Sequence, residues 1–307
     1  MYRLGVDLGG TNIAVGLVVK KEGELVHKDS VKTPKGKPSE ILETIFKLCE
    51  KILNDKNLTQ NDVKYIGMGV PGTCDYERGI IGFAPNIKFN NVNVREGMAK
   101  FTSIPIQIDN DANCAALGES IQGAAAQYNN SVTVTLGTGV GVGVVLNGKL
   151  VRGNVEAGHH IINFNGTLCG CGRKGCLEAY CSATALIRDA KIAVEKNPDS
   201  KILSIATTAD LIEAKTVFDA AERGDETAKA LLKDYIFYLS VGITNFVTTY
   251  PIQAVIFGGG VAYQGEKLLK PLREAMTSLS YPGAEQVDLK IAKLGNDAGI
   301  IGAAMMD

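Results

Sequence analysis

The feature that most constrains the fold of this chain is a glycine-containing turn that occurs twice. Val6-Asp7-Leu8-Gly9-Gly10-Thr11 is followed by a valine-rich run, and so is Val134-Thr135-Leu136-Gly137-Thr138-Gly139. A repeat at such long spacing indicates a duplicated domain rather than a solenoid. We therefore expect an α/β protein of two domains around a cleft. The smaller N-terminal domain would span residues 1–116, completed by a C-terminal helix at 296–307, and the larger would span residues 117–295.

Apolar periodicity predicts the main elements. Helical spacing indicates helices over residues 176–194 and 226–249, and buried apolar runs indicate strands over 63–70 and 254–257. Residues 235–265 carry no charge and exceed the roughly 20 residues that span a bilayer. Pro251 and several polar residues interrupt this run, which favours a buried helix followed by a buried strand over a membrane span.

Composition excludes several classes of protein. The chain has 307 residues, 32 Lys and Arg against 33 Asp and Glu, and 45% hydrophobic residues, which argues against intrinsic disorder. A net charge of −1 argues against binding nucleic acid by bulk electrostatics. The N-terminus has no signal-peptide pattern, and the seven cysteines are an odd number, so we expect a cytoplasmic protein without a disulfide framework.

The glycine turns suit phosphate binding, because their backbone N–H groups are accessible and no Cβ blocks an approaching anion. Asp7 beside the first turn could hold Mg²⁺ through water, since Mg²⁺ binds few carboxylates and keeps several waters. The alternative is an ordinary hairpin turn. A third glycine cluster, Gly258-Gly259-Gly260, favours the ligand-binding interpretation, although none of these sequences is a Walker A or Rossmann motif.

Acidic and amide side chains gather in Asp109-Asn110-Asp111-Ala112-Asn113, where a predicted strand ends and a helix begins. The N-terminus of a helix lowers the pKa of a nearby carboxyl group, so at least one acid should be ionised and able to accept a proton. The alternative is a helix cap. Because the two acids are two residues apart, only one of them needs to face a cleft.

A metal site is predicted within residues 159–176. His159, Cys169, Cys171 and Cys176 supply one imidazole and three thiolates, which suit tetrahedral Zn²⁺. The competing interpretations are free thiols or a disulfide within the loop. His160 is an alternative imidazole, and Cys181 is a spare thiol packed in a helix.

Two glutamates flank this loop. Glu156 precedes His159 by three residues, and Glu178 follows Cys176 by two. A metal that fixes the loop would also fix these carboxylates, which are good acceptors for sugar hydroxyls. Taken alone, each is more often a solvated surface residue.

Together these motifs resemble the ROK family, within the actin-like (ribonuclease H-like) sugar-kinase fold, over essentially the whole chain. The resemblance rests on six segments: Asp7-Leu8-Gly9-Gly10-Thr11-Asn12, Gly69-Val70-Pro71-Gly72, Asn110-Asp111-Ala112-Asn113, Leu136-Gly137-Thr138-Gly139-Val140-Gly141, Glu156-Ala157-Gly158-His159 and Cys169-Gly170-Cys171-Gly172-Arg173-Lys174-Gly175-Cys176-Leu177-Glu178. The last two are highly specific.

The resemblance implies a role for each matching position. Asp111 would be the catalytic base, and sugar hydroxyls would be contacted by Asn110, Glu156, His159 and Glu178, with Asn86 and Gly72 lining the same pocket. His159 would place one ring nitrogen on zinc and the other toward the sugar. ATP phosphates would be contacted by Gly9, Gly10, Thr11, Asn12, Thr138 and Gly139. The nucleoside would lie beside Gly258, Gly259 and Gly260.

The resemblance also implies an activity. We expect an ATP-dependent hexokinase-type enzyme with Mg²⁺ and structural Zn²⁺, most like a glucokinase, that forms homodimers or homotetramers. Repressors of the family carry a DNA-binding domain before the first glycine motif, which here begins at Asp7, so the kinase branch is favoured. The alternatives are an N-acetylmannosamine or other N-acetylhexosamine kinase, a fructokinase, or a sugar sensor without turnover.

Overall fold

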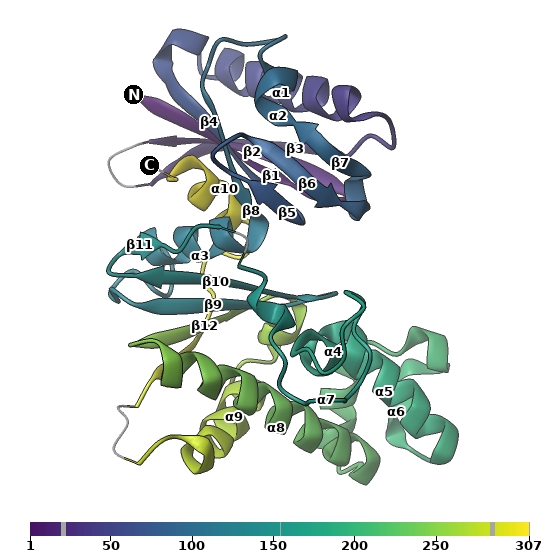
Figure 1. Ribbon diagram of the computed structural model, residues 1–307. Helices are drawn as coiled ribbons and strands as arrows, with labels where there is room; N and C mark the ends of the chain where they lie inside the picture. The colour runs from purple at the N-terminus through teal and green to yellow at the C-terminus, as the bar shows by residue number, and fades with distance from the viewer. Residues whose placement is uncertain (20–22, 154, 283–285, 307) are drawn as a thin grey trace. The chain divides into compact units, whose positions relative to one another are not determined.

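The computed structural model describes residues 1–19, 23–153, 155–282 and 286–306. The chain divides into two compact units, one of residues 1–133, 143–155 and 293–307 and one of residues 134–142 and 156–292 (Figure 1). The domain boundary predicted after residue 116 lies within helix α3 (Asp111–Ile121), which continues through that position. Asp307, the last residue of the predicted terminal helix, lies outside the described residues.

The first unit contains a five-stranded sheet in the order β3-β2-β1-β4-β8. Its strands are β1 (Tyr2–Leu8), β2 (Asn12–Val19), β3 (Leu25–Lys32), β4 (Val63–Val70) and β8 (Ile106–Asn110). The first three form an antiparallel meander, while β4 runs parallel to β1 and to β8. In this register Asp7 pairs with Gly69, and Gly69 pairs with Asp109. The carboxyl ends of three parallel strands therefore meet at one edge of the sheet, where open α/β sheets bind ligands.

Helices cover both faces of this sheet. Leu4, Val6 and Leu8 pack in one core with the apolar side of α1 (Pro38–Asp55). The alternate residue Gly5 faces α10 (Asp297–Ala304), and a Cβ on Gly5 would lie 1.9 Å from the carbonyl oxygen of Ile300. Glycine at this position therefore lets α10 lie directly against the strand.

A small antiparallel sheet follows β4. It consists of β5 (Thr73–Asp75), β6 (Ile80–Ala84) and β7 (Phe89–Asn93). A 3-10 turn at Pro85–Ile87 joins β6 to β7, and the short helix α2 (Val94–Met98) follows β7. Another 3-10 turn, at Gln60–Asp62, comes directly before β4. This sheet was not predicted from the sequence. Gly72 lies at its start with φ of 79°, and a Cβ there would lie 2.0 Å from the carbonyl oxygen of Phe83. Only glycine fits this position.

The other large sheet has the order β11-β10-β9-β12-β13. Its strands are β9 (Ser131–Leu136), β10 (Val140–Leu146), β11 (Lys149–Leu150), β12 (Ala254–Gly258) and β13 (Asp288–Ile291). If the strands of each sheet are numbered 1 to 5 along the chain, both sheets have the spatial order 3-2-1-4-5. This common order confirms the duplicated α/β fold that the repeated glycine turns predicted.

The second unit is rich in helices. They are α4 (Glu178–Cys181), α5 (Ala183–Lys196), α6 (Lys201–Ala206), α7 (Ala214–Glu222), α8 (Glu226–Thr249) and α9 (Glu266–Leu279), with 3-10 turns at Ala157–His159, Ala209–Leu211 and Gly260–Gln264. The helix predicted over residues 176–194 is two helices, because Ser182 is extended and its hydroxyl caps α5 by accepting from the Ala185 amide at 3.0 Å. Among the described helices, none combines the length and apolar character that a bilayer span needs.

Candidate active site and metal centre

The two acids between β8 and α3 have different surroundings. Asp109 is fully buried, and its carboxylate accepts hydrogen bonds from the Asn110 amide (2.8 Å), Asn113 Nδ2 (2.8 Å) and Arg152 Nε (2.7 Å). Asp111 is exposed in the first turn of α3. Of the two predicted acids, Asp111 is therefore the one that a ligand can reach.

Asn110 connects this junction to the small sheet. Its Oδ1 caps α3 by accepting from the amides of Ala112 at 2.9 Å and Asn113 at 3.4 Å. Its Nδ2 donates to the carbonyl oxygen of Gly72 at 3.1 Å. The helix-cap alternative thus holds for Asn110, and the same bonds bring together Asn110 and Gly72, two residues predicted to contact the sugar.

Asp7 lies near Asp111 at the end of β1. Burial and, to a smaller extent, the negative charge of Asp111 together raise the pKa of Asp7 to about 6. On its other side, a Cβ on Gly299 would lie 3.4 Å from the Asp7 carboxyl carbon. Two neighbouring carboxylates, one of them withdrawn from water, form an oxygen donor set that a hard divalent cation such as Mg²⁺ accepts.

The first glycine turn joins β1 to β2. The Gly9 amide donates to the carbonyl oxygen of Asn12 at 2.9 Å, and Thr33 Oγ1 donates to that of Gly9 at 2.7 Å. Gly10, Thr11 and Asn12 are exposed. A Cβ on Gly10 would lie 3.2 Å from Cβ of Asn86, so the predicted phosphate turn and the predicted sugar residue Asn86 are neighbours.

The second glycine turn joins β9 to β10. The Ala183 amide donates to the carbonyl oxygen of Gly137 at 2.8 Å, and Thr184 Oγ1 donates to that of Thr138 at 2.8 Å. These bonds attach the turn to the N-terminus of α5, while the Thr138 side of the turn remains exposed. The Gly137 amide donates to the carbonyl oxygen of Gly139 at 3.0 Å, so an anion could approach the turn only at its exposed Thr138 side.

The triple glycine lies beside the same strand. Gly259 has φ of 82°, and a Cβ there would lie 2.5 Å from the carbonyl oxygen of Leu136. Gly258 is buried, whereas Gly259 and Gly260 are exposed. The predicted nucleoside residues and the second glycine turn are thus neighbours at the end of β9.

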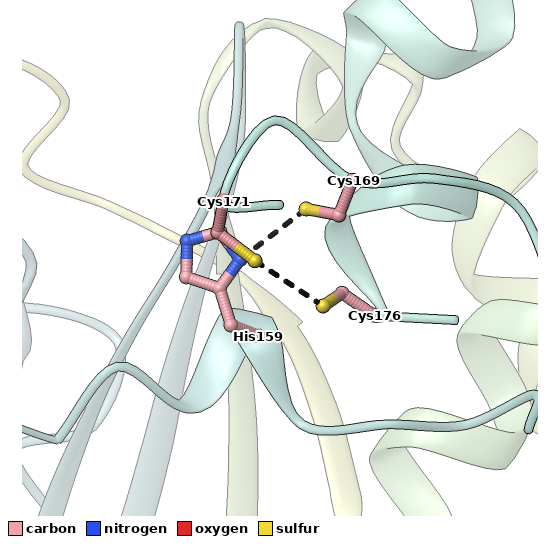
Figure 2. A group of neighbouring side chains, drawn as sticks. All are labelled: His159, Cys169, Cys171 and Cys176. Carbon is pink, nitrogen blue, oxygen red and sulfur yellow. Dashed lines mark hydrogen bonds between the residues drawn. The ribbon is translucent and has the colours of Figure 1, made fainter. Parts of the chain in front are cut away.

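Figure 2 shows the imidazole of His159 and the sulfur atoms of Cys169, Cys171 and Cys176 converging on one point. Their ligand atoms all lie within 4.8 Å of one another. Cys171 Sγ is 3.7 Å from Cys176 Sγ, and Cys169 Sγ is 3.5 Å from His159 Nδ1. A tetrahedron with Zn–S of about 2.3 Å and Zn–N of about 2.0–2.1 Å has S–S and S–N edges of about 3.8 and 3.6 Å. The four residues therefore fit a zinc ion.

The loop that carries these ligands is a tight hairpin. The Cys169 amide donates to the carbonyl oxygen of Arg173 at 2.8 Å, and the Gly172 amide donates back to that of Cys169 at 2.9 Å. Desolvation works against ionisation of the Cys171 thiol, but hydrogen bonds from the Arg173 backbone and side chain outweigh it and lower the pKa to about 6. One ligand is thus poised to be a thiolate at neutral pH, the form that binds metal.

The other candidate groups in the loop are directed elsewhere. His160 Nδ1 lies 2.6 Å from the carbonyl oxygen of Ala157, and its ring packs edge-on against Phe246. His159, not His160, is therefore the imidazole of the cluster. Cys181 is fully buried in α4, as predicted. All seven cysteines are free, and the 3.7 Å between Cys171 and Cys176 is far longer than a disulfide bond of about 2.05 Å.

Glu178 joins the metal cluster to the second glycine turn. Its Oε1 lies 3.5 Å from Cys169 Sγ and 3.8 Å from His159 Nδ1, while its Oε2 accepts from the Val140 amide at 3.0 Å. Glu156 is exposed just before the 3-10 turn that carries His159. The structure therefore holds Glu178 by defined contacts and presents Glu156 to solvent.

Known proteins are similar to this chain over nearly its whole length. The glucokinase of Halalkalibacterium halodurans is 34% identical over 312 residues, covering 99% of this chain and 94% of that protein. The glucokinase of Thermotoga maritima is 36% identical over 307 residues, covering 98% and 95%. The crystal structure of a ROK family glucokinase from Streptomyces griseus in complex with glucose and AMPPNP aligns with a TM-score of 0.81 at 32% identity, covering 99% of this chain and 98% of that one.

A family model describes almost the whole chain. The model of the ROK family matches residues 3–306, which include both glycine turns, the junction of β8 and α3, and the metal cluster. The chain belongs to the ROK family.

Proposed function

We propose that this protein is an ATP-dependent sugar kinase that transfers the γ-phosphoryl group of ATP to the 6-hydroxyl of a hexose, with glucose as the preferred substrate. The observation that carries the proposal is the exposed Asp111 at the start of α3, beside an Asp109 whose carboxylate is fully occupied within the protein. The near full-length similarity to glucokinases supports glucose as the substrate.

Asp111 is assigned the role of general base. Its position in the first turn of α3 favours the ionised carboxylate, because the helix N-terminus carries partial positive charge. The carboxylate would accept the proton of the 6-hydroxyl as that oxygen attacks the terminal phosphorus of ATP. General-base assistance of this kind contributes about 10²- to 10⁴-fold, and positioning with electrostatics supplies most of the remaining acceleration.

The remaining predicted residues are assigned to binding. The residues proposed to bind the sugar are Gly72, Asn86, Asn110, Glu156, His159 and Glu178. Those proposed to bind ATP are Gly9, Gly10, Thr11, Asn12, Thr138, Gly139, Gly258, Gly259 and Gly260. Asp7 would hold Mg²⁺ through water, and the ion when bound would offset the negative charge of the transferred group. The positive charge of the bound Mg²⁺ would also favour the ionised form of Asp7, whose pKa is raised to about 6 by burial and by Asp111.

We assign a structural role to zinc. The cluster offers four protein ligands, which complete a tetrahedral coordination and leave no position for a reacting water. The ion would fix the 159–176 loop and, through the contacts of Glu178, the sugar-binding carboxylate. A homodimer or homotetramer and a cytoplasmic location stay predictions.

An ADP-release assay across glucose, mannose, fructose, N-acetylglucosamine and N-acetylmannosamine tests the proposal. We expect glucose to give the highest kcat/KM and Asp111→Asn to give no more than about one-hundredth of the wild-type rate. Preference for an N-acetylated sugar or fructose would change the substrate within the family. Sugar binding by calorimetry without ADP release from any of them would refute the kinase assignment and favour a sensor.

A further inference from the structure

Arg152 is a charged residue beside the candidate active site that the sequence analysis did not identify. It follows β11, and its Nε donates to Oδ2 of the fully buried Asp109 at 2.7 Å. One terminal nitrogen donates to the carbonyl oxygen of Ile108 at 3.2 Å, and the guanidinium lies 4.3 Å from the ring centre of Tyr76. Three separate contacts therefore fix the orientation of this side chain, which is only 29% exposed.

The partner of Arg152 is a costly group to bury alone. Removing one member of a buried ion pair strongly destabilises a protein, because the other charge is left without compensation. The other acceptor atom of Asp109, Oδ1, is already engaged by the Asn113 side chain and the Asn110 amide. Within the described part of the chain, Arg152 supplies the ion pair that compensates this carboxylate.

The same carboxylate is bonded to the residues that carry the proposed chemistry. The amide that donates to Asp109 Oδ1 belongs to Asn110, which caps α3 and precedes Asp111. Arg152 also donates to the carbonyl oxygen of Ile108, so it is bonded to two consecutive residues of β8, Ile108 and Asp109, directly before Asn110. A change in the position of Asp109 would move Asn110 and Asp111 with it.

We propose that Arg152 is a positioning residue for the sugar site, which acts by holding the Asp109 carboxylate and through it the main chain of Asn110 and Asp111. The proposal rests on the function proposed above, and it adds a residue that need not touch the substrate. A misplacement of about 1 Å at a reacting group can lower a rate about 100-fold. Arg152 therefore contributes to turnover of the sugar although all of its described contacts are internal.

The test compares Arg152→Gln, Arg152→Lys, Asp109→Asn and the double variant Asp109→Asn/Arg152→Gln. We expect Arg152→Gln to lower kcat/KM for glucose by about 10- to 100-fold while KM for ATP stays within about twofold, since the first glycine turn is held by its own bonds to Thr33. Arg152→Lys keeps the charge and should recover part of this loss. The double variant should be less impaired than the product of the two single effects, because it leaves no uncompensated buried charge.

Arg78→Gln is the matched control. Arg78 belongs to the same unit and pairs with Asp75 at 3.8 Å, but its side chain is 78% exposed, so both activity and melting temperature should stay near wild type. Folded Arg152→Gln with wild-type kcat/KM for glucose, or single effects that simply multiply, would overturn the proposal. A wild-type protein that phosphorylates no hexose would instead refute the proposed function. The coupling between Arg152 and Asp109 would then still be measured from the melting temperatures of the same two single variants and the double variant.

Discussion

Asp7→Asn should stabilise the protein at neutral pH while removing its activity. Burial, assisted by the charge of Asp111, raises the pKa of Asp7 from 3.8 to about 6. The native state therefore binds a proton at Asp7 more tightly than the unfolded state does. Below about pH 3.8 the carboxyl is protonated in both states and imposes no penalty, whereas above about pH 6 the native state must hold a poorly solvated anion.

The size of this penalty follows from the pKa difference. Each pKa unit corresponds to about 1.4 kcal/mol, so ionised Asp7 costs the native state about 3 kcal/mol at pH 8. Asparagine has the same shape and no charge, so the substitution should recover most of this free energy at pH 8 and almost none at pH 4. With about 2–4 °C per kcal/mol, the melting temperature should rise by roughly 6–12 °C at pH 8.

Thermal unfolding in Mg²⁺-free buffer between pH 4 and pH 8 measures this effect. The difference between Asp7→Asn and wild type should grow as the pH rises through about 6. Asp199→Asn, at an exposed position, is the control and should show no such dependence. An equal stabilisation at pH 4 and pH 8, or a destabilisation at pH 8, would refute the conclusion that the Asp7 carboxylate is poorly solvated and has a raised pKa.

Three further outcomes are expected. Asp111→Asn should keep glucose binding in calorimetry but lose about 10²- to 10⁴-fold in kcat, and near-normal turnover would remove Asp111 from the role of base. Purified protein should contain about one equivalent of zinc by metal analysis, and less than about one-tenth equivalent would contradict the structural zinc. The variant Cys176→Ser should lose zinc, melt at a lower temperature and bind glucose more weakly. Gly67→Ala places a Cβ 1.8 Å from the carbonyl oxygen of Ala303 and should lower the free energy of unfolding by about 1–3 kcal/mol or more in urea titrations.

Elements defined by strong periodicity were predictable. Helix α8 and strand β4 have the predicted bounds, because the burial of an apolar face decides both and the sequence pattern records it directly. The metal cluster was equally accessible, since closely spaced ligands in a short loop have few other uses, and the structure brings all four together. The predicted ROK membership is confirmed by the family model, and the duplicated α/β fold is confirmed by the common strand order of the two large sheets.

Features that depend on long-range contacts were not predictable. The strands of the β5-β6-β7 sheet are three to five residues long, too short for a pattern to distinguish them from loops. The break at Ser182 interrupts an otherwise helical spacing and is fixed by the cap that the hydroxyl provides. Arg152 is a lone arginine 43 residues from Asp109, and nothing in the sequence links the two. The individual sugar and nucleotide contacts stay predictions.

Helix α10 has a consequence for the order in which this protein can fold. Its eight residues pack against β1, β4 and α3, where glycines on both sides allow backbone contact, yet they follow the whole second unit in the sequence. On a ribosome, the second unit can be complete in sequence while the N-terminal sheet still exposes the face that α10 will cover. Nascent chains should therefore carry an unfinished N-terminal sheet until α10 has been synthesised, and this interval is when the protein most needs protection from aggregation.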